Sequence, residues 1–578
     1  MKRRPTSRLT SQALAWMIAL GSSIGLANAQ GVPEPVPVQT DVRVGTYIFP
    51  MWLRPGTDGH GNENWNEWAT LHKVDAPRAV LGFYDGSNPE VNDWQIKWAL
   101  EAGISWFAFD WYWNAGESRL MGTLEDGFLK SKYQSKMQFC IHWCNHALDW
   151  KKDLDFSPEA LEEMIEYNAK HYFTRDNYLK IDGRPVFMVW DMDPVILANG
   201  GPDAFRANVL PRLNTVCKRY GVGDLFLVLV QNWPHRVGFS TVGDAFTGYS
   251  YAGLTTETPV SANTSAPYAE MVDALPPYWA GMHRSARLPF LTSTQSGWDN
   301  TPRQAMGHPR LVRQGSTAEL FERTLQDGRK QVKPEFPFFL IEAWNEFGEG
   351  SYIEPTEQHG FDYLAAIRRV FAPGAAPHTW ARPSQAQVES YTSLTPGQIE
   401  ESKQPPVPLP PLPTPQWHMD VAIDPSTNVP PTIVRQFDFG GSSLPDGVTA
   451  NSLTVVPATD GSTRFRNEQG KGSLTFNGNF GTASDGLTVE ITLRYPDTPV
   501  WLAQLLFGLD GAAPLPDSAR PFLWKRDDRE HVYRLTFNAS RTSSGELTSF
   551  RLDAPDWPGA EFDLRTVRIT RPQPADKP

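Results

Sequence analysis

Eight short apolar runs, rich in aromatic residues, alternate with helical patterns between residues 42 and 346. Strands that are apolar along their whole length are typical of a parallel sheet with both faces buried. Eight such strands alternating with helices predict an α/β fold, a (β/α)8 TIM barrel with long loops. The runs cover residues 42–50, 105–113, 137–144, 184–191, 224–231, 245–252, 288–295 and 336–346.

Helix-start signals lie between these runs. Asn88 and Ser157 are each followed by proline, which is favoured at the first helical position, and Gly103 can end the helix that starts after Asn88. Ser316 and Glu319 have the spacing of a capping box. The sequence therefore predicts helices that begin at these three positions.

Two proline-rich stretches punctuate the chain. A lead over residues 30–41 precedes the predicted barrel domain at 42–400, and a stiff, extended linker follows at 401–416. The linker separates the barrel from a second domain at 417–578, so we expect two domains with different architectures.

The second domain has a different periodicity of apolar residues. Residues 487–495 alternate between apolar and polar side chains, and turn signals such as Asp460-Gly461 and Asn477-Gly478 separate short strand patterns. This pattern predicts a C-terminal antiparallel β-sandwich that is jelly-roll-like. We interpret it as a carbohydrate-binding or accessory module, with a plain structural spacer as the alternative.

Residues 1–29 have the pattern of a secretory signal peptide. A basic start precedes a short apolar run at 13–20, and Ala27-Asn28-Ala29 has the form of a cleavage site. Removal of this segment takes away four basic residues and no acidic residue, which changes the formal net charge from −12 to −16. A strongly acidic protein repels nucleic acid and anionic membranes, so we expect a secreted or periplasmic protein that binds neither.

The three cysteines do not suggest a disulfide scaffold. Cys140 and Cys144 lie four residues apart in one predicted strand, which is too far for a disulfide, and Cys217 makes the count odd. Alternation would place both cysteines with His142 and His146 on one strand face. Zinc sites prefer pairs on turns, so we expect no metal site there.

The active site of a (β/α)8 barrel lies at the carboxyl ends of its strands. Stacking rings, amides and carboxylates gather at these ends, a mixture that fits a sugar better than an apolar ligand. A structural role stays open for each: Asp110 or Asp191 could cap a helix, Tyr249 could be a core residue and His142 a buried imidazole. Arg303 also follows the seventh run. The candidate substrate-binding residues are Tyr47, Asp110, Trp111, Tyr112, Trp113, His142, Trp143, Asn145, Asp191, Gln231, Asn232, Trp233, Tyr249, Trp298, Asp299, Trp344 and Asn345.

The last predicted strand ends with two carboxylates three residues apart, Glu346 and Glu349. Hydrolysis of a glycoside needs one acid to protonate the leaving oxygen and a second carboxylate to assist at the anomeric centre. Retaining enzymes hold the pair about 5–5.5 Å apart and inverting enzymes about 6.5–9.5 Å. Gly348 and Gly350 allow a turn that brings the two together, and proximity raises the pKa of one. The alternative is an acidic turn that faces solvent.

The motif "EAWNEFGEGSYIEP" at 342–355 resembles the signature of glycoside hydrolase family 99 and its WbsX-like relatives. The segments at 80–113 and 296–303 are similar to two further stretches of the WbsX group, so the resemblance covers about residues 44–372. It implies a (β/α)8 endo-acting α-mannosidase that retains anomeric configuration. No metal or organic cofactor is implied, and the partner is a carbohydrate substrate.

By this resemblance Glu349 is the general acid/base. Glu346 is the base that deprotonates the 2-hydroxyl of the sugar, whose oxygen then attacks the anomeric carbon through an epoxide-like intermediate. Family 99 usually has Trp and then His between the glutamates, where this chain has Phe347 and Gly348. The departure places the chain nearer the WbsX-like group, whose substrates need not be mannosides.

Three functions compete. The favoured one is a secreted glycoside hydrolase that cleaves a poly- or oligosaccharide. A WbsX-type glycosyltransferase is disfavoured by the signal peptide, because nucleotide-sugar donors are cytoplasmic, and "DMD" at 191–193 is the one candidate metal motif. A non-catalytic glycan-binding protein would not need both glutamates.

Overall fold

The computed structural model describes most of the chain in two separate cores. The described residues are 31–55, 66–114, 116–146, 154–230, 242–254, 264–285, 288–306, 310–406, 419–423, 432–456, 458, 460–467, 472–482, 486–495, 502–514, 520–524, 528–537, 545–554 and 561–571.

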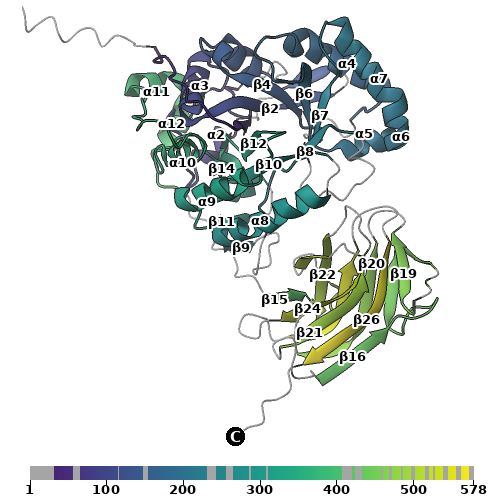
Figure 1. The fold of residues 1–578 in the computed structure, drawn as a ribbon. Coiled ribbons are helices and arrows are strands. Elements are labelled where there is room, and N and C mark those ends of the chain that lie inside the picture. Colours follow the sequence, from purple (N-terminus) through teal and green to yellow (C-terminus); the bar gives the residue numbers. More distant parts are fainter. Residues whose placement is uncertain are drawn as a thin grey trace, which may run out of the picture.

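Eight parallel strands close into a barrel, as the eight apolar runs predict (Figure 1). Closure is made by the first strand, which pairs in parallel with both the second strand and the last one. The predicted fold class is therefore confirmed. The barrel strands are β1 (Arg43–Ile48), β2 (Ile104–Asn114), β4 (Gln138–Trp143), β6 (Arg184–Val189), β7 (Phe226–Val230), β8 (Ala245–Thr247), β10 (Phe290–Gln295) and β12 (Phe338–Glu342).

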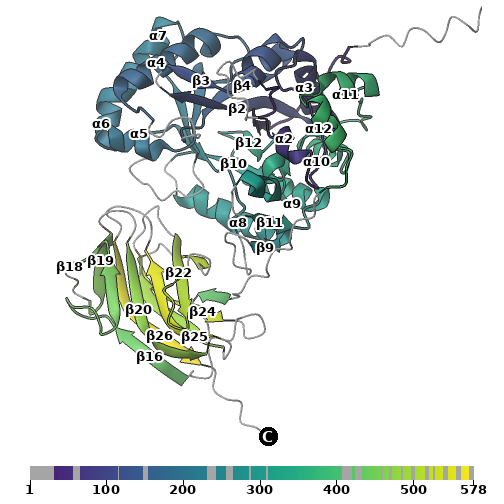
Figure 2. The same cartoon turned by 180° about the vertical axis from the view of Figure 1, so that it is seen from behind.

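Helices surround the barrel on its outside, as the view from behind also shows (Figure 2). They are α2 (Trp68–Leu71), α3 (Pro89–Ala102), α4 (Pro158–Asn168), α5 (Met192–Ala198), α6 (Pro202–Ala204), α7 (Leu210–Arg219), α8 (Tyr268–Ser285), α9 (Ala318–Arg329), α10 (Asp362–Phe371), α11 (Gln385–Tyr391) and α12 (Pro396–Glu401). Short strands decorate the loops: β3 (Glu117–Arg119), β5 (Lys180–Ile181), β9 (Thr264–Pro267), β11 (Leu311–Gln314), β13 (Asn345–Glu346) and β14 (Ser351–Tyr352).

Two of the three predicted helix starts are confirmed. Asn88 caps α3 by accepting from the Glu90 amide at 2.9 Å, and Ser157 caps α4. Gly103 ends α3 with φ at 97°, a left-handed conformation that glycine adopts without strain. The third start is wrong by one residue: Thr317, and not Ser316, is the N-cap of α9.

Helix α3 is buried nearly all round, beyond the single apolar face of a surface helix. Its outer side is covered by chain that follows the last barrel helix: Trp94 donates to the Tyr391 hydroxyl and Trp98 to the Ala381 carbonyl. The proline-rich lead also lies on it, since the Val38 amide donates to the Leu100 carbonyl. These contacts fix the ends of the first domain against the barrel.

The second domain consists of two antiparallel sheets, which confirms the predicted β-sandwich. The alternation at 487–495 is confirmed too, because its five apolar side chains are all buried. The first sheet contains β15 (Met419–Ile423), β16 (Thr432–Asp438), β18 (Leu453–Val456), β19 (Thr463–Asn467), β21 (Thr488–Arg494), β24 (Glu530–Phe537) and β26 (Glu561–Arg571). The second contains β17 (Val448–Asn451), β20 (Ser473–Thr482), β22 (Leu502–Leu509), β23 (Arg520–Leu523) and β25 (Glu546–Asp553).

One predicted turn of this domain is wrong. Asn477-Gly478 lies inside β20, where the pairing with β25 shifts register between Asn477 and Gly481. Phe476 and Phe480 on either side are both buried. A β-bulge therefore accommodates the extra residues while the strand continues.

Two further features are the state of the cysteines and the length of the helices. Cys140, Cys144 and Cys217 are buried and none forms a disulfide. Within the described part of the chain, no helix combines the length and apolar character needed to cross a bilayer.

Candidate active site

Three carboxylates converge on one arginine at the carboxyl end of the barrel. Arg303 donates from Nε to Glu67 at 2.9 Å, from Nη2 to Glu346 at 2.5 Å and from Nη1 to Glu349. Its guanidinium also lies over the Phe49 ring, 5.2 Å from the centroid. Because Glu346 and Glu349 bind neighbouring nitrogens of one guanidinium, their spacing is compatible with the about 5–5.5 Å of retaining glycosidases.

A tight turn after β12 brings the two glutamates together. Strands β13 and β14 pair as a hairpin, and residues Phe347–Glu349 between them form one turn of 3-10 helix. Gly350 closes the turn with φ at 66°. A side chain at Gly348 would meet Glu67 Oε2 at 2.1 Å, so the glycine leaves the space that Glu67 occupies. The turn that the glycines permit therefore forms.

Burial sets the protonation of the pair. Loss of solvent raises the pKa of both Glu346 and Glu349, while the Arg303 charge opposes this rise. The Glu349 charge further raises the pKa of Glu346, and the Glu67 charge further raises that of Glu349, so the site retains a proton to higher pH than an ordinary carboxyl group. The side chain of Glu349 is 18% exposed and that of Glu346 only 2%.

A second polar cluster lies on the inner face of neighbouring strands. Asp110 Oδ1 and His142 Nδ1 are 2.7 Å apart, and the Tyr249 hydroxyl donates to Asp110 Oδ2 at 3.5 Å. The Tyr47 ring lies 5.0 Å from the His142 ring and 4.8 Å from that of Tyr249. The Asp110 charge contributes to the raised pKa of Glu346, so the two clusters share one site.

This second cluster also contains donors that could hold a metal ion. One ligand atom each of Asp110, His142 and Cys144 lies within 4.8 Å of the others. Burial raises the pKa of the Cys144 thiol well above its usual value, which disfavours the thiolate that a metal would need. Cys140 instead contacts Met188, and the His146 ring lies near Tyr112 and Trp190.

Four of the predicted tryptophans pack in the core. Trp111 and Trp113 stack at 5.4 Å and contact Tyr167 of α4, so they face the helices and not the barrel axis. Trp143 donates to the Trp113 carbonyl, and Trp344 is fully buried against Phe107. The structure therefore separates these rings from the carboxylates. Burial raises the pKa of their neighbour Tyr112 well above its usual value, and the charges of Asp110 and Glu346 add to this rise, so Tyr112 lies near both clusters.

Three of the predicted polar residues form hydrogen bonds with main-chain groups. Asn145 exchanges two hydrogen bonds with the Asp191 main chain, and Asp191 caps α5 through the Asp193 amide at 3.0 Å. Asn345 accepts from the Phe49 amide at 2.8 Å and donates to its carbonyl. The helix-cap alternative is thus observed for Asp191, whereas Asp110 binds His142.

The remaining predicted substrate-binding residues lie outside both polar clusters or outside the described residues. Trp298 is half-buried and Asp299 is exposed, and both line a small cavity behind the glutamate turn. Gln231, Asn232 and Trp233 lie outside the described residues.

Sequence reasoning missed three acidic residues of this region. Glu67 lies in a loop with no motif, and Glu342 ends β12 with both carboxylate oxygens buried and without a hydrogen-bond partner among the described residues. Glu354 belongs to the quoted motif: it accepts from Gln95 at 2.9 Å and from Tyr84 at 2.7 Å. Since Asn345 also donates to the Tyr84 hydroxyl, Glu354 helps to hold the glutamate turn.

Comparisons with known proteins find related sequences. A family model described as "Glycosyltransferase WbsX" matches residues 70–367. Two curated proteins from Xanthomonas campestris pv. campestris, both described as "Uncharacterized protein WxcX", are 24% identical to this chain. Each alignment covers 64% of this chain and 53% of the relative, so the chain spans about half the length of the curated relatives it matches.

Solved structures also align with part of this chain. A "Glycoside hydrolase-like protein" aligns with a TM-score of 0.43 and 19% identity, covering 59% of this chain and 97% of that one. The GH99 endo-alpha-mannosidase from Bacteroides thetaiotaomicron aligns with a TM-score of 0.36 and 16% identity, covering 58% of this chain and 97% of the other.

Proposed function

This chain belongs to the WbsX family, and from that premise we propose that it is an exported glycoside hydrolase that cleaves a poly- or oligosaccharide with retention. One observation carries the proposal: two buried glutamates at the end of the last barrel strand share the guanidinium of Arg303. Binding alone does not need such a pair, whereas glycoside hydrolysis does.

The proposed roles follow from exposure. Glu349 is the more exposed of the two, so it can protonate the leaving oxygen and later exchange its proton with water. Glu346 lies deeper and accepts the proton of the 2-hydroxyl, whose oxygen attacks the anomeric carbon as the glycosidic bond breaks. Water then opens the epoxide-like intermediate, with Glu349 as base and Glu346 returning its proton. The two displacements together retain configuration.

Residues on the inner strand faces would bind the sugar. Asp110 and His142 offer hydrogen bonds, because the Nε2 atom of His142 is buried and has no partner among the described residues. Tyr47 and Tyr249 offer ring faces beside them. This combination of hydrogen-bonding groups and ring faces suits a polyhydroxylated sugar ring. An α-mannoside is therefore among the candidate substrates.

The family description favours a second candidate, a glycosyltransferase. The charge of the site speaks against it. Glu67, Glu346 and Glu349 face a single arginine, and Asp110 adds a further carboxylate nearby. Such an excess of negative charge repels the diphosphate of a nucleotide sugar. A non-catalytic glycan-binding protein is the third candidate, and it would leave the paired glutamates without a role.

Release of reducing ends tests the proposal. The protein without residues 1–29 and its Glu349→Gln variant are incubated with α-mannans and a panel of bacterial and algal polysaccharides. We expect release by the unsubstituted protein and a loss of about 10²–10⁴-fold in the variant. NMR of the first product should show the anomeric configuration of the substrate. Transfer from a nucleotide sugar without hydrolysis would establish the second candidate, and binding without either reaction would establish the third.

A further inference from the structure

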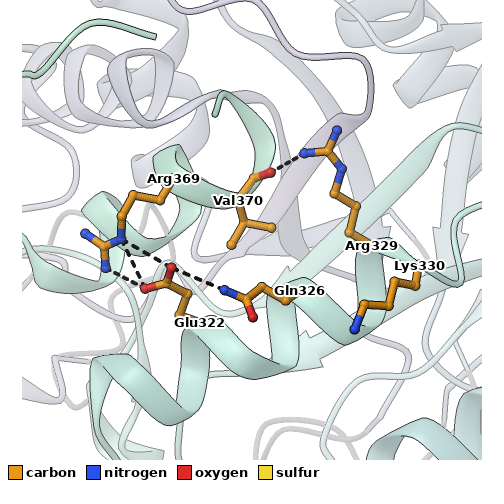
Figure 3. Close-up of a pocket in the computed structure, with 6 residues that line it drawn as sticks. All are labelled: Glu322, Gln326, Arg329, Lys330, Arg369 and Val370. Atoms are coloured by element: carbon orange, nitrogen blue, oxygen red, sulfur yellow. Dashed lines mark hydrogen bonds and ion pairs between the residues drawn. The ribbon is translucent and has the colours of Figure 1, made fainter. Parts of the chain in front are cut away.

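Among the pockets lined by described residues, two that lie outside the carboxylate cluster differ in what they offer a ligand. The larger, about 530 Å³, is open and lies between α9 and α10 (Figure 3). Its charged groups are already engaged: Arg369 binds Glu322, Arg329 binds Asp41 and the Val370 carbonyl, and Lys330 binds Asp327. This pocket therefore offers no unengaged charge for recognition.

The smaller cavity, about 170 Å³, lies directly behind the glutamate turn. Phe347 and Gly350 of the turn form part of its wall, and Trp298 and Asp299 form another part. The Asp299 amide donates to the Glu349 carbonyl at 2.6 Å, and a side chain at Gly350 would meet the Asp299 nitrogen at 2.5 Å. The backbone of the proposed acid, Glu349, is thus in direct contact with the wall of the cavity.

Aromatic rings line this cavity. The Phe347 and Tyr352 rings stack at 5.0 Å, and Tyr363 and His359 lie beside them. Phe347, Tyr352 and Tyr363 are buried, so the half-buried Trp298 is the ring best placed to stack on the C–H face of a sugar.

Polar groups complete the lining. Trp298 Nε1 is buried without a hydrogen-bond partner in the described part of the chain, so it is a donor that a ligand oxygen could satisfy. Asp75 and Asp299 are exposed at the cavity and can accept from hydroxyl groups. Arg313 also lines it, but its guanidinium donates to the carbonyls of Ala252, Leu254 and Pro267.

From these observations we infer that the cavity behind the glutamate turn is a second carbohydrate site, which binds one neutral sugar ring. Its volume is below the roughly 300–1,000 Å³ of pockets for drug-sized ligands, which limits the occupant to a single ring. The two aspartates disfavour uronates and sulfated sugars, because like charges repel. The choice of a carbohydrate as the ligand rests on the proposed function, whereas the cavity and its lining do not.

Counting bound sugars tests the inference independently of catalysis. Equilibrium dialysis of labelled D-mannose, D-glucose and D-galactose is carried out with full-length protein in a Glu349→Gln background. Trp298→Ala removes a ring and the unpartnered donor, whereas Ser316→Trp fills the cavity from its rim. We expect each change to remove one bound sugar per chain, or to raise its Kd about tenfold. Trp380→Ala, a half-buried tryptophan stacked on Phe361, is the matched control and should change nothing.

The opposite results are equally definite. An unchanged count in both cavity variants, or no bound neutral sugar in the background protein, would overturn the second site. Displacement of the sugar by D-glucuronate as effectively as by D-glucose would overturn the neutral assignment. Failure of hydrolysis in the unsubstituted protein would contradict the proposed function and leave this count unaffected.

Discussion

At the scale of single residues, Arg303 organises the candidate site. Its three nitrogens bind Glu67, Glu346 and Glu349, an arrangement that needs a planar fork of donors. A lysine in its place would keep the positive charge but concentrate it on a single ammonium group, without the planar fork of donors. The geometry of the glutamates therefore depends on the guanidinium itself.

We predict that Arg303→Lys lowers kcat/KM by about 10–10²-fold and moves the pH–rate profile. The arginine charge favours ionised Glu346 and Glu349, so weaker pairing raises the pKa of both. Both limbs of the profile should then shift to higher pH. Arg310→Lys, at a buried arginine seven positions further along the chain, is the control. An unshifted profile would contradict this role.

Gly348 makes room for Glu67 and carries a second prediction. The Cβ of Gly348→Ala would lie 2.1 Å from Glu67 Oε2 and 3.0 Å from Arg303 Nε. Because the buried Glu67 would have to shift away from Arg303, we expect a loss of stability of about 1–3 kcal/mol and activity reduced about 10²-fold. Thermal unfolding and kcat/KM measure the two effects. Gly374→Ala, with no atom within 4 Å of its Cβ, should be silent in both.

At the scale of elements, the cap of α9 distinguishes two adjacent residues. Thr317 accepts from the Leu320 amide at 3.3 Å, whereas Ser316 donates to the Arg313 carbonyl. We predict that Thr317→Ala destabilises the protein by about 1 kcal/mol. Ser316→Ala should cost less than half of that, as denaturant midpoints would measure. The reverse order would mean that Ser316 is the cap.

The barrel elements were predictable because apolar runs and proline-marked helix starts are local signals. The error at α9 arose because Ser316 and Thr317 are both good caps, and the Glu319 spacing favoured the wrong one. Asn477-Gly478 is a strong turn signal, but the buried rings of Phe476 and Phe480 keep the strand continuous through a bulge.

The site was predictable only in part. The turn with Glu346 and Glu349 follows from its motif, and alternation along β2 could have separated inward Asp110 from outward Trp111 and Trp113. Glu67 could not be found, because its loop has no periodic pattern and its contact with Arg303 spans 236 residues.

At the scale of the whole molecule, Glu354 makes folding depend on pH. Burial raises the pKa of Glu354 to about 7, above the ordinary value of 4.5. The folded state thus holds a proton that the unfolded state releases between these values. The stability from this group is complete below about pH 4.5 and is lost as pH rises through about 7.

We therefore predict that Glu354→Gln flattens the loss of stability between these pH values. The difference from the unsubstituted protein should reach about 3 kcal/mol at most. Urea unfolding at several pH values measures it. Glu357→Gln, at an exposed glutamate of the same segment, should keep the original slope. Parallel slopes for all three proteins would show that Glu354 titrates normally.

The central claim is that Glu346 and Glu349 act as one catalytic unit. The most direct measurement is a double-mutant cycle on the rate of reducing-end release, with Glu346→Gln, Glu349→Gln and both together. We predict that each single change lowers the rate by about 10²–10⁴-fold and that the double variant is no slower than the worse single one. Single variants that retain full activity, or losses that multiply in the double variant, would contradict the claim.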